Sequence, residues 1–189
     1  MIPQDVQVDN LPRRREDIPV KTITLASVKG GVGKTTVTVG LALALKRRGL
    51  AAGILDLDWR SPSIPLALGQ MEGSIKHLPG DRLQPVEVGG MPVISMGFLW
   101  PPEIAVLMEE AEAVEDVQEV LRPGVVVWPQ LDFLLVDTPP MSSGITVAAI
   151  RSAGVAGVMV TNATPLAHAG LLRTLDLFRE SVVPVYGLV

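Results

Sequence analysis

Short apolar runs alternate with longer helical stretches along most of the chain, and this pattern predicts strands and helices in turn. Runs typical of buried strands occupy 21–27, 51–57, 133–137, 155–161 and 183–189. Stretches with helical character occupy 35–48, 64–68, 103–121, 144–153 and 164–180. Strands that alternate with helices are typical of an α/β fold, so we expect a doubly wound, mainly parallel sheet with helices on both faces.

Some parts of the pattern carry more specific expectations. The helix at 35–48 is apolar nearly all round, with Val39 and Leu43 off its main stripe, and is therefore expected to be deeply buried. The helix at 103–121 is amphipathic and has a dense acidic face, which we interpret as a solvated surface, with docking of a basic partner as the alternative. Short runs at 84–88 and 92–96 flank Gly89 and Gly90, which predicts a hairpin. The stretch before them, up to Asp81, is rich in turn residues and weakly patterned.

The chain is expected to hold one domain. Residues 1–19 have little apolar periodicity and contain a basic triplet at 13–15, so we expect a flexible lead-in there. Residues 20–189 are expected to form the domain, because a chain of 189 residues is long enough to bury a substantial core.

A glycine-rich loop at 27–36 stands between the first predicted strand and the first predicted helix. Such a turn presents consecutive backbone N–H groups to an anion, and the positive end of the following helix adds to the field. This is the layout of a P-loop, so we predict an ATP site. The residues predicted to bind the nucleotide are Gly30, Gly31, Val32, Gly33, Lys34, Thr35 and Thr36. Lys34 is expected to reach the β- and γ-phosphates in catalysis, and the Thr35 hydroxyl to bind Mg²⁺.

The loop departs from the common P-loop pattern in one respect. Val28 stands where the first glycine of G-x-x-x-x-G-K-[ST] is expected, and Lys29 precedes a Gly-Gly pair. This K-G-G-x-G-K-[ST] form resembles the deviant P-loop of the MinD/ParA/Mrp group of ATPases. The resemblance implies a homodimer in which the catalytic Lys29 reaches the nucleotide of the partner subunit.

Three aspartates at the ends of predicted strands complete the candidate site. Asp137 ends an apolar strand in the manner of a Walker B element, which would place its carboxylate beside the P-loop and close to Mg²⁺. Alternation along an extended segment puts the carboxylates of Asp56 and Asp58 on the same side, where both could face the phosphates. We assign Asp58 to orient the attacking water and Asp56 to the outer shell of the metal. The alternative is that either residue merely caps the helix that begins near Ser63.

Composition narrows the function classes. The chain has no cysteine, which removes disulfides, thiol nucleophiles and thiolate metal ligands from these residues. A formal net charge of −4 offers no broad basic field for nucleic acid. No apolar stretch approaches the roughly 18 residues that read as a membrane span, and the first residues lack the pattern of a secretory signal. We therefore expect a cytoplasmic protein that neither binds nucleic acid nor spans a membrane.

Four further segments resemble one branch of this group, the Mrp (ApbC) family. Residues 55–65, LDLDWRSPSIP, resemble its D-x-D-x-x-x-P-S-I-P segment, and residues 95–99, SMGFL, resemble its S-[IM]-G-F-L. Residues 131–140, LDFLLVDTPP, match its L-D-[YF]-L-[IV]-[IV]-D-x-P-P, and residues 183–189, VPVYGLV, resemble its V-P-V-x-G-[IV]-V strand. The resemblance implies a dimeric Mg-ATP-dependent protein with slow ATP hydrolysis. Such a protein carries iron–sulfur clusters to apo-proteins or works with assembly factors.

The chain also departs from the family pattern. WPP at 100–102 stands where W-R-G-P is usual, and MSSG at 141–144 lacks the aspartate of the usual G-T-G-D. The family's C-x-x-C, which bridges the cluster between subunits, follows the last predicted strand and is absent from this sequence, so we expect an ATPase domain that lacks its C-terminal part. The alternative function is a MinD/ParA-type ATP-dependent dimerisation switch that binds a partner or a surface without a cluster.

Overall fold

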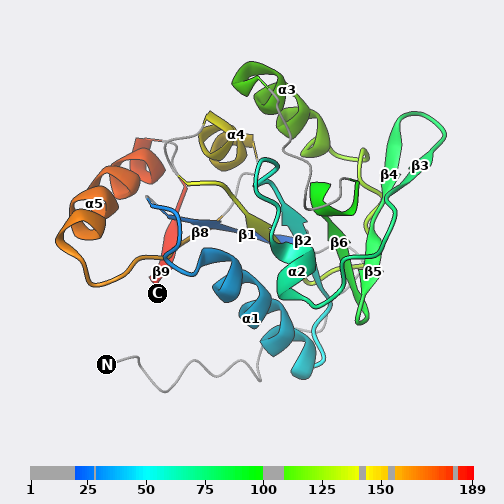
Figure 1. Cartoon of the computed structure of the whole chain (residues 1–189), viewed down its shortest axis with the longest axis horizontal. Helices are drawn as coiled ribbons and strands as arrows, with labels where there is room; N and C mark the ends of the chain where they lie inside the picture. The colour runs from blue at the N-terminus through cyan, green and yellow to red at the C-terminus, as the bar shows by residue number, and fades with distance from the viewer. Residues whose placement is uncertain (1–19, 28, 100–108, 141–143, 153–155, 181–182) are drawn as a thin grey trace.

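A seven-stranded sheet, parallel except at one edge, forms the centre of the molecule (Figure 1). The computed structural model describes residues 20–27, 29–99, 109–140, 144–152, 156–180 and 183–189. In chain order the strands of this sheet are β1 (Lys21–Ala26), β2 (Ala52–Asp56), β5 (Val86–Val88), β6 (Met91–Ile94), β7 (Phe133–Asp137), β8 (Ala156–Met159) and β9 (Val185–Leu188). Across the sheet their order is β5-β6-β2-β7-β1-β8-β9.

Helices cover both faces of the sheet, so the predicted fold class is confirmed. They are α1 (Lys34–Arg47), α2 (Ile64–Ala67), α3 (Glu110–Val120), α4 (Gly144–Ser152) and α5 (Pro165–Glu180), with the 3-10 helix η2 (Met96–Phe98). α1 lies on one side of the strands, whereas α3 and α4 pack together on the other (Figure 1). Right-handed crossovers require this arrangement, because the chain moves in opposite directions along the sheet after β1 and after β7. None of these described helices is long and apolar enough to cross a bilayer.

The two halves of the sheet meet between β1 and β7, which are adjacent although they are far apart in sequence. β1 runs parallel to β7 with Leu25 beside Asp137, and β2 runs parallel to β7 with Asp56 beside Asp137. The carboxyl ends of the three strands therefore reach the same edge of the sheet. In open α/β sheets ligands bind at this edge, where the direction of the connections reverses.

The burial of α1 differs from the expectation. Its buried positions form one face and are Lys34, Thr38, Val39, Ala42 and Leu45. Leu43, by contrast, is 39% exposed, and Ala44 is exposed as well. The prediction of a deeply buried helix was wrong, because only one face of α1 packs on the sheet while the other faces solvent (Figure 1).

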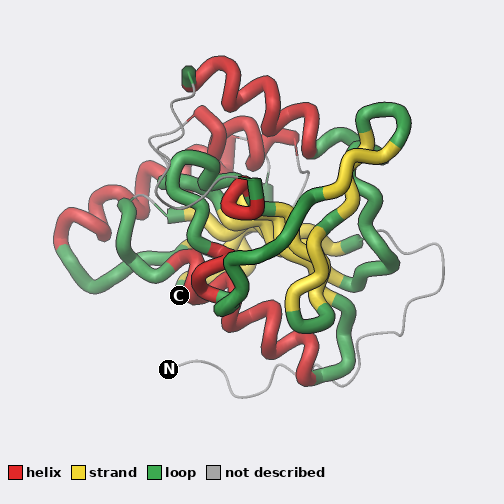
Figure 2. Tube along the Cα trace, turned by 45° about the vertical axis from the view of Figure 1, so that its right-hand side comes forward, coloured by secondary structure: helices red, strands yellow, loops and turns green. Residues whose placement is uncertain are grey.

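A small two-stranded sheet was not predicted. β3 (Lys76–Leu78) and β4 (Arg82–Gln84) pair in antiparallel fashion and project from the main sheet (Figure 2). The backbone N–H of Leu83 donates to the carbonyl of Val125 at 2.7 Å, and that of Val127 donates to the carbonyl of Leu83 at 2.8 Å. These bonds attach the hairpin to the segment after α3. The hairpin that was predicted around Gly89 and Gly90 is present as β5 and β6.

Some sequence predictions reach beyond the described residues. The flexible lead-in at 1–19 and the departures at 100–102 and 141–143 lie outside them. The helix predicted at 103–121 is described only from residue 109, and α3 begins at Glu110.

Gly157→Ala in β8 is expected to destabilise the fold by about 2 kcal/mol, which is the usual cost of overpacking a core. A Cβ at this position would clash with Cε1 of Phe178, a fully buried ring of α5. Gly187→Ala in the neighbouring β9 is the matched control, because a Cβ there meets no atom within 4 Å. Urea unfolding measures both variants against the parent protein, and equal stability of the two would contradict the predicted clash.

Candidate functional site

A cavity of ≈ 730 Å³, here named the P-loop cavity, opens at the carboxyl edge of the sheet. Its walls are the loop after β1, the segment after β2 and the segment after β7. The lining includes every residue predicted to bind the nucleotide, namely Gly30, Gly31, Val32, Gly33, Lys34, Thr35 and Thr36, and also Lys29 and Asp58. The volume falls in the range of about 300–1,000 Å³ that is typical of small-molecule sites.

Two glycines of the loop adopt a backbone conformation that other residues rarely adopt. Gly31 and Gly33 have φ angles of 76° and 96°, and an added Cβ would meet nothing within 4 Å at either position. The backbone conformation, rather than lack of space, therefore selects glycine. Gly33 directly precedes α1, whose start is capped by no described side chain and whose first residues line the cavity. The positive end of this helix thus faces a space suited to an anion.

Asp137 is the centre of a buried hydrogen-bond network. Its fully buried carboxylate accepts from Lys34 Nζ at 2.8 Å, from Thr35 Oγ1 at 2.7 Å and from Thr38 Oγ1 at 3.0 Å. Thr35 Oγ1 also lies 3.1 Å from Ser63 Oγ. The predicted site residues Lys34, Thr35 and Asp137 are therefore in direct contact.

Asp56 lies beside Asp137 in the neighbouring strand but has separate hydrogen-bond partners and does not line the cavity. Its carboxylate is fully buried and accepts from Ser95 Oγ at 2.8 Å and from the backbone N–H of Asp58 at 3.1 Å. Burial raises the pKa of Asp56 to about 7, with a further contribution from the negative charge of Asp137 in the neighbouring strand. A cation beside the two carboxylates would favour the ionised form of Asp56.

Asp58 is half-buried and does line the cavity. Burial raises the pKa of its carboxyl group, and the positive charge of Lys34 opposes that shift. Alternation predicted that both aspartates would face the phosphates, but β2 ends at Asp56 and Asp58 lies in the turn that follows. The structure therefore gives the two carboxylates different positions. The Asp56 carboxylate bonds Ser95 rather than capping α2, whose preceding residue is Ser63.

Sequence reasoning missed three side chains that contact the predicted site residues: Thr38, Ser63 and Ser95. Thr38 lies one helical turn after Lys34 and its hydroxyl is 3.1 Å from the Lys34 carbonyl, so helix periodicity could have found it. Ser63 lies within the segment at 55–65 that resembles the Mrp pattern, but only the aspartates of that segment were predicted to act at the site. Ser95 is the first residue of the segment at 95–99 that resembles the Mrp pattern, but its contact with Asp56 depends on the pairing of β6 with β2, which no local pattern specifies.

The oxygen atoms of this network suit a magnesium ion. Thr35 supplies a hydroxyl at the cavity wall, Asp137 supplies the carboxylate bonded to it, and Asp56 lies beside Asp137 in the adjacent strand. Within the described ranges, no group of three or more His, Cys, Asp or Glu side chains could hold a metal. Mg²⁺ does not need such a group, since it is usually held by one or two carboxylates together with substrate phosphates and water.

Asp56→Asn is expected to stabilise the ligand-free protein above pH 7. The pKa of Asp56 in the folded protein, about 7, exceeds the ordinary value of 3.8. Between these values the folded protein binds more protons than the unfolded chain, so its stability falls as the pH rises. The loss is complete above the folded-state pKa and is on the order of 4 kcal/mol, which a neutral asparagine avoids.

Urea unfolding at several pH values between about 5 and 8, without Mg²⁺ or nucleotide, measures this effect. The slope of stability against pH should be smaller in Asp56→Asn than in the parent protein. Glu87→Gln, which neutralises an exposed carboxyl group on β5, should keep the parent slope. Parallel profiles for the parent protein and Asp56→Asn would contradict the prediction.

Comparisons with known proteins agree with this geometry. The sequence model of the family described as ParA: NUBPL iron-transfer P-loop NTPase matches residues 19–189. An iron–sulfur cluster carrier protein of Deinococcus radiodurans is 34% identical over 168 residues, which are 88% of this chain and 47% of that protein. The iron–sulfur cluster transfer protein NUBPL of Mus musculus is 33% identical over 183 residues, 95% of this chain and 56% of that protein. The chain spans about half the length of the curated relatives it matches.

Solved structures share the fold. A nucleotide-binding protein from Archaeoglobus fulgidus, in complex with ADP, has a TM-score of 0.74 at 30% identity and covers 89% of this chain and 65% of its own. The septum site-determining protein MinD of Pyrococcus horikoshii, complexed with Mg-ADP, has a TM-score of 0.68 at 20% identity, covers 90% of this chain and 69% of its own, and supports the fold alone. Because the family match covers nearly the whole chain, the protein belongs to the ParA/NUBPL iron-transfer P-loop NTPase family, in agreement with the Mrp resemblance.

Proposed function

We propose that the protein binds Mg-ATP in the P-loop cavity, hydrolyses it slowly, and acts in cytoplasmic iron–sulfur cluster assembly or transfer. The observation that carries the proposal is the contact of Lys34 and Thr35, both in the cavity wall, with the buried carboxylate of Asp137. A phosphate cradle, a charge clamp and a metal anchor thus occur together. The names of the relatives support the cluster part of the proposal.

Nucleotide binding rests on the loop and on two lysines. The backbone N–H groups of residues 30–36 bind the phosphates, as expected of a glycine-rich turn before a helix. Lys34, whose Nζ is 2.8 Å from Asp137 Oδ1, turns from this carboxylate to the β- and γ-phosphates. Lys29 is exposed at the cavity wall, where it can reach the nucleotide of a second subunit in a homodimer.

Hydrolysis needs an anchor for the metal and a group that orients water. Thr35 and Asp137 would hold Mg²⁺, with Asp56 in the outer shell, and the ion would supply positive charge beside the phosphates. Asp58 is the only carboxylate among the described residues that line the P-loop cavity, so we assign it to accept a hydrogen bond from the attacking water. The water oxygen bonds to the γ-phosphorus as the bond from that atom to the β–γ bridging oxygen breaks, which yields ADP and phosphate.

Cluster transfer needs ligands that these residues do not supply, because the chain has no cysteine. We propose that the C-x-x-C implied by the Mrp resemblance provides them in a longer gene product, with apo iron–sulfur proteins or assembly factors as partners. The codons that follow Val189 in the gene test this. A C-x-x-C there would support the carrier, whereas a basic amphipathic helix would support a MinD/ParA-type dimerisation switch without a cluster.

Lys29→Ala is expected to weaken an ATP-dependent homodimer while leaving ATP binding by each subunit largely intact. The variant loses a charge-assisted hydrogen bond to phosphate across the interface, which is worth about 2 kcal/mol, or roughly 30-fold in the dimer dissociation constant. Light scattering with Mg-ATP over a concentration series measures this. Lys76→Ala, which changes an exposed lysine of β3, is the control. A dimer that both variants form equally well would count against the role of Lys29.

A further inference from the structure

A second cavity of ≈ 370 Å³ lies among the β3–β4 hairpin, η2 and α3. Its floor consists of buried or half-buried apolar side chains, those of Ile75, Leu83, Ile94, Met96 and Val120. The proposed nucleotide chemistry uses none of them. The volume is at the low end of the range for small-molecule sites, so the cavity suits an inserted side chain of a partner better than a nucleotide.

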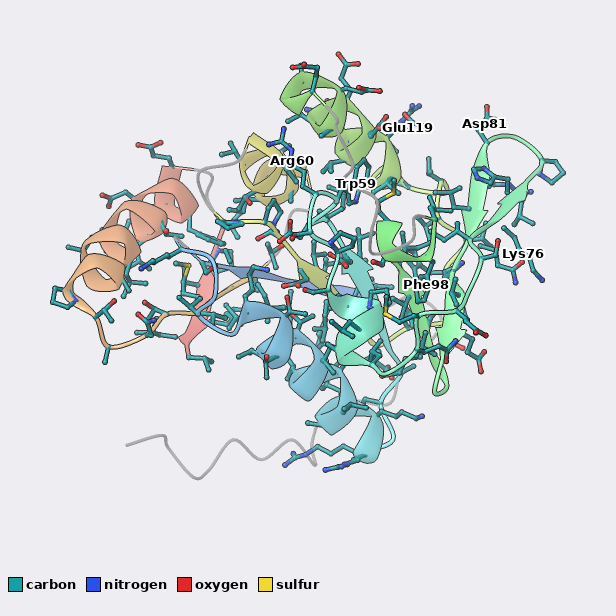
Figure 3. All side chains as sticks on the ribbon, in the orientation of Figure 1. Trp59, Arg60, Lys76, Asp81, Phe98 and Glu119 are labelled. Atoms are coloured by element: carbon teal, nitrogen blue, oxygen red, sulfur yellow. The ribbon has the colours of Figure 1, made fainter. Side chains whose placement is uncertain are left out.

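The rim of the second cavity is acidic. Asp81 at the tip of the hairpin and Asp116 and Glu119 on α3 line it, and Figure 3 shows Asp81 and Glu119 on the two elements that border it. None of the described residues that line this cavity is a lysine or an arginine, and its one histidine is His77 of β3. Lys76 is not part of the lining, and Arg122 pairs with Glu119 at the surface. The negative charge of the rim therefore rests mainly on Asp81 and Asp116.

Two links join the second cavity to the P-loop cavity. The ring of Trp59 lines both cavities, is 6% exposed, and donates from Nε1 to the backbone carbonyl of Asp56 at 3.1 Å. Ser95 donates to the Asp56 carboxylate and accepts from the backbone N–H of Gly97 at 3.2 Å, where η2 begins. Met96 of η2 then lines the second cavity. A shift of the segment that carries Asp56 would therefore change the positions of residues that line both cavities.

From this geometry we infer that the second cavity docks a segment of a partner protein in which an apolar side chain is flanked by lysines or arginines. The apolar floor holds the anchor side chain, and the acidic rim attracts the flanking cations. Nucleic acids and anionic lipid surfaces carry the wrong charge for this rim. We further infer that nucleotide in the P-loop cavity changes the affinity for this segment; that part rests on the proposed nucleotide site, whereas the docking does not.

The probe is a short fluorescent amphipathic peptide of leucine and lysine, and the same peptide with glutamate for lysine is its control. In anisotropy titrations with the full chain, the lysine peptide should bind and the glutamate peptide should not. Asp81→Asn combined with Asp116→Asn should weaken binding about fivefold. Glu112→Gln combined with Glu115→Gln makes the same charge change on exposed α3 residues outside the cavity lining and should leave binding unchanged.

A second pair of variants tests whether the peptide contacts the cavity lining. Leu99→Lys places a cation in the cavity lining at a residue that is 41% exposed, and it should abolish binding of the lysine peptide. Leu172→Lys, at an exposed position of α5, is the matched control and should not change binding. Mg-ADP should change the peptide Kd at least about fivefold, and the peptide should change the Kd of Mg-ADP by the same factor.

The docking site would be overturned if the lysine peptide bound the Asp81→Asn, Asp116→Asn variant as tightly as its control. Equal affinity of the peptide for Leu99→Lys and Leu172→Lys would overturn it as well. Peptide binding that Mg-ADP leaves unchanged, with ADP binding confirmed directly, would overturn the coupling through Trp59 and Ser95. Absence of ADP binding would overturn the proposed nucleotide site and the coupling with it, while a charge-dependent affinity for the peptide would still support the docking site.

Discussion

Lys34→Ala is expected to reduce ATP affinity at least about 100-fold, which would place binding below the range of an ordinary titration. The ammonium group of Lys34 is in the cavity wall and already contacts the carboxylate of Asp137 at 2.8 Å. Without this charge, the triphosphate would lie beside the carboxylate of Asp58, and Lys29 and Arg60 would be the cations left among the described residues of the lining. Isothermal titration with Mg-ATP measures the change.

A loss of binding by Lys34→Ala must be separated from a loss of folding. Removing one partner of a buried ion pair is costly, but Asp137 keeps the hydroxyl donors of Thr35 and Thr38. The thermal stability of Lys34→Ala should therefore be measured together with its ATP affinity. Lys76→Ala, which removes a lysine outside the cavity, is the control. A folded Lys34→Ala with the parent affinity for ATP would refute the P-loop assignment.

The elements that could be predicted from the sequence are those with local signals. β7 has its predicted bounds, because a continuous apolar run that ends in an acid marks a strand buried on both faces. The β3–β4 hairpin has no such signal, since its strands are three residues each and carry polar side chains. Contacts with the segment after α3 hold it in place. The exposure of Leu43 was missed for a related reason, because the apolar pattern of a helix does not state which of its faces a neighbour covers.

The candidate site likewise has features with a local sequence signal and contacts that depend on the order of the strands. The loop at 27–36 is contiguous, so its conformation and its place before a helix could be predicted from the sequence alone. The contact between Lys34 and Asp137 depends on β1 lying beside β7, and the contact between Asp56 and Ser95 depends on β2 lying beside β6. Alternation of strands and helices does not specify this order. The sequence therefore predicted that Asp137 lies beside the P-loop, whereas the hydrogen bonds of Asp137 with Lys34 and Thr38 and the contact of Asp56 with Ser95 were not predicted.

Asp58→Ala is expected to keep ATP binding and to slow hydrolysis about 100-fold, the lower end of what a positioned acid or base contributes. Asp58 is half-buried in the cavity wall, whereas Asp56 is enclosed with Ser95 and does not line the cavity. Removing the Asp58 charge also removes repulsion toward the phosphates, so the Kd for ATP should stay the same or fall. This outcome distinguishes Asp58→Ala from Lys34→Ala, in which binding itself is lost. Single-turnover hydrolysis and calorimetric titration give the two quantities separately.

The dependence of the hydrolysis rate on pH adds a second test of Asp58, because a purely structural role would not produce the predicted profile. Because burial raises the pKa of Asp58 and its ionised form is the stronger acceptor toward water, the hydrolysis rate of the parent protein should rise with pH as the carboxyl group ionises. Asp58→Ala should lose this rise, whereas Asp176→Ala, which removes an exposed carboxylate of α5, should keep both the rise and the parent rate. If Asp58→Ala hydrolysed ATP at the rate of the parent protein, the group that orients the attacking water would be another residue of the cavity wall. A joint loss of binding and turnover would instead assign Asp58 to the folding of the turn after β2.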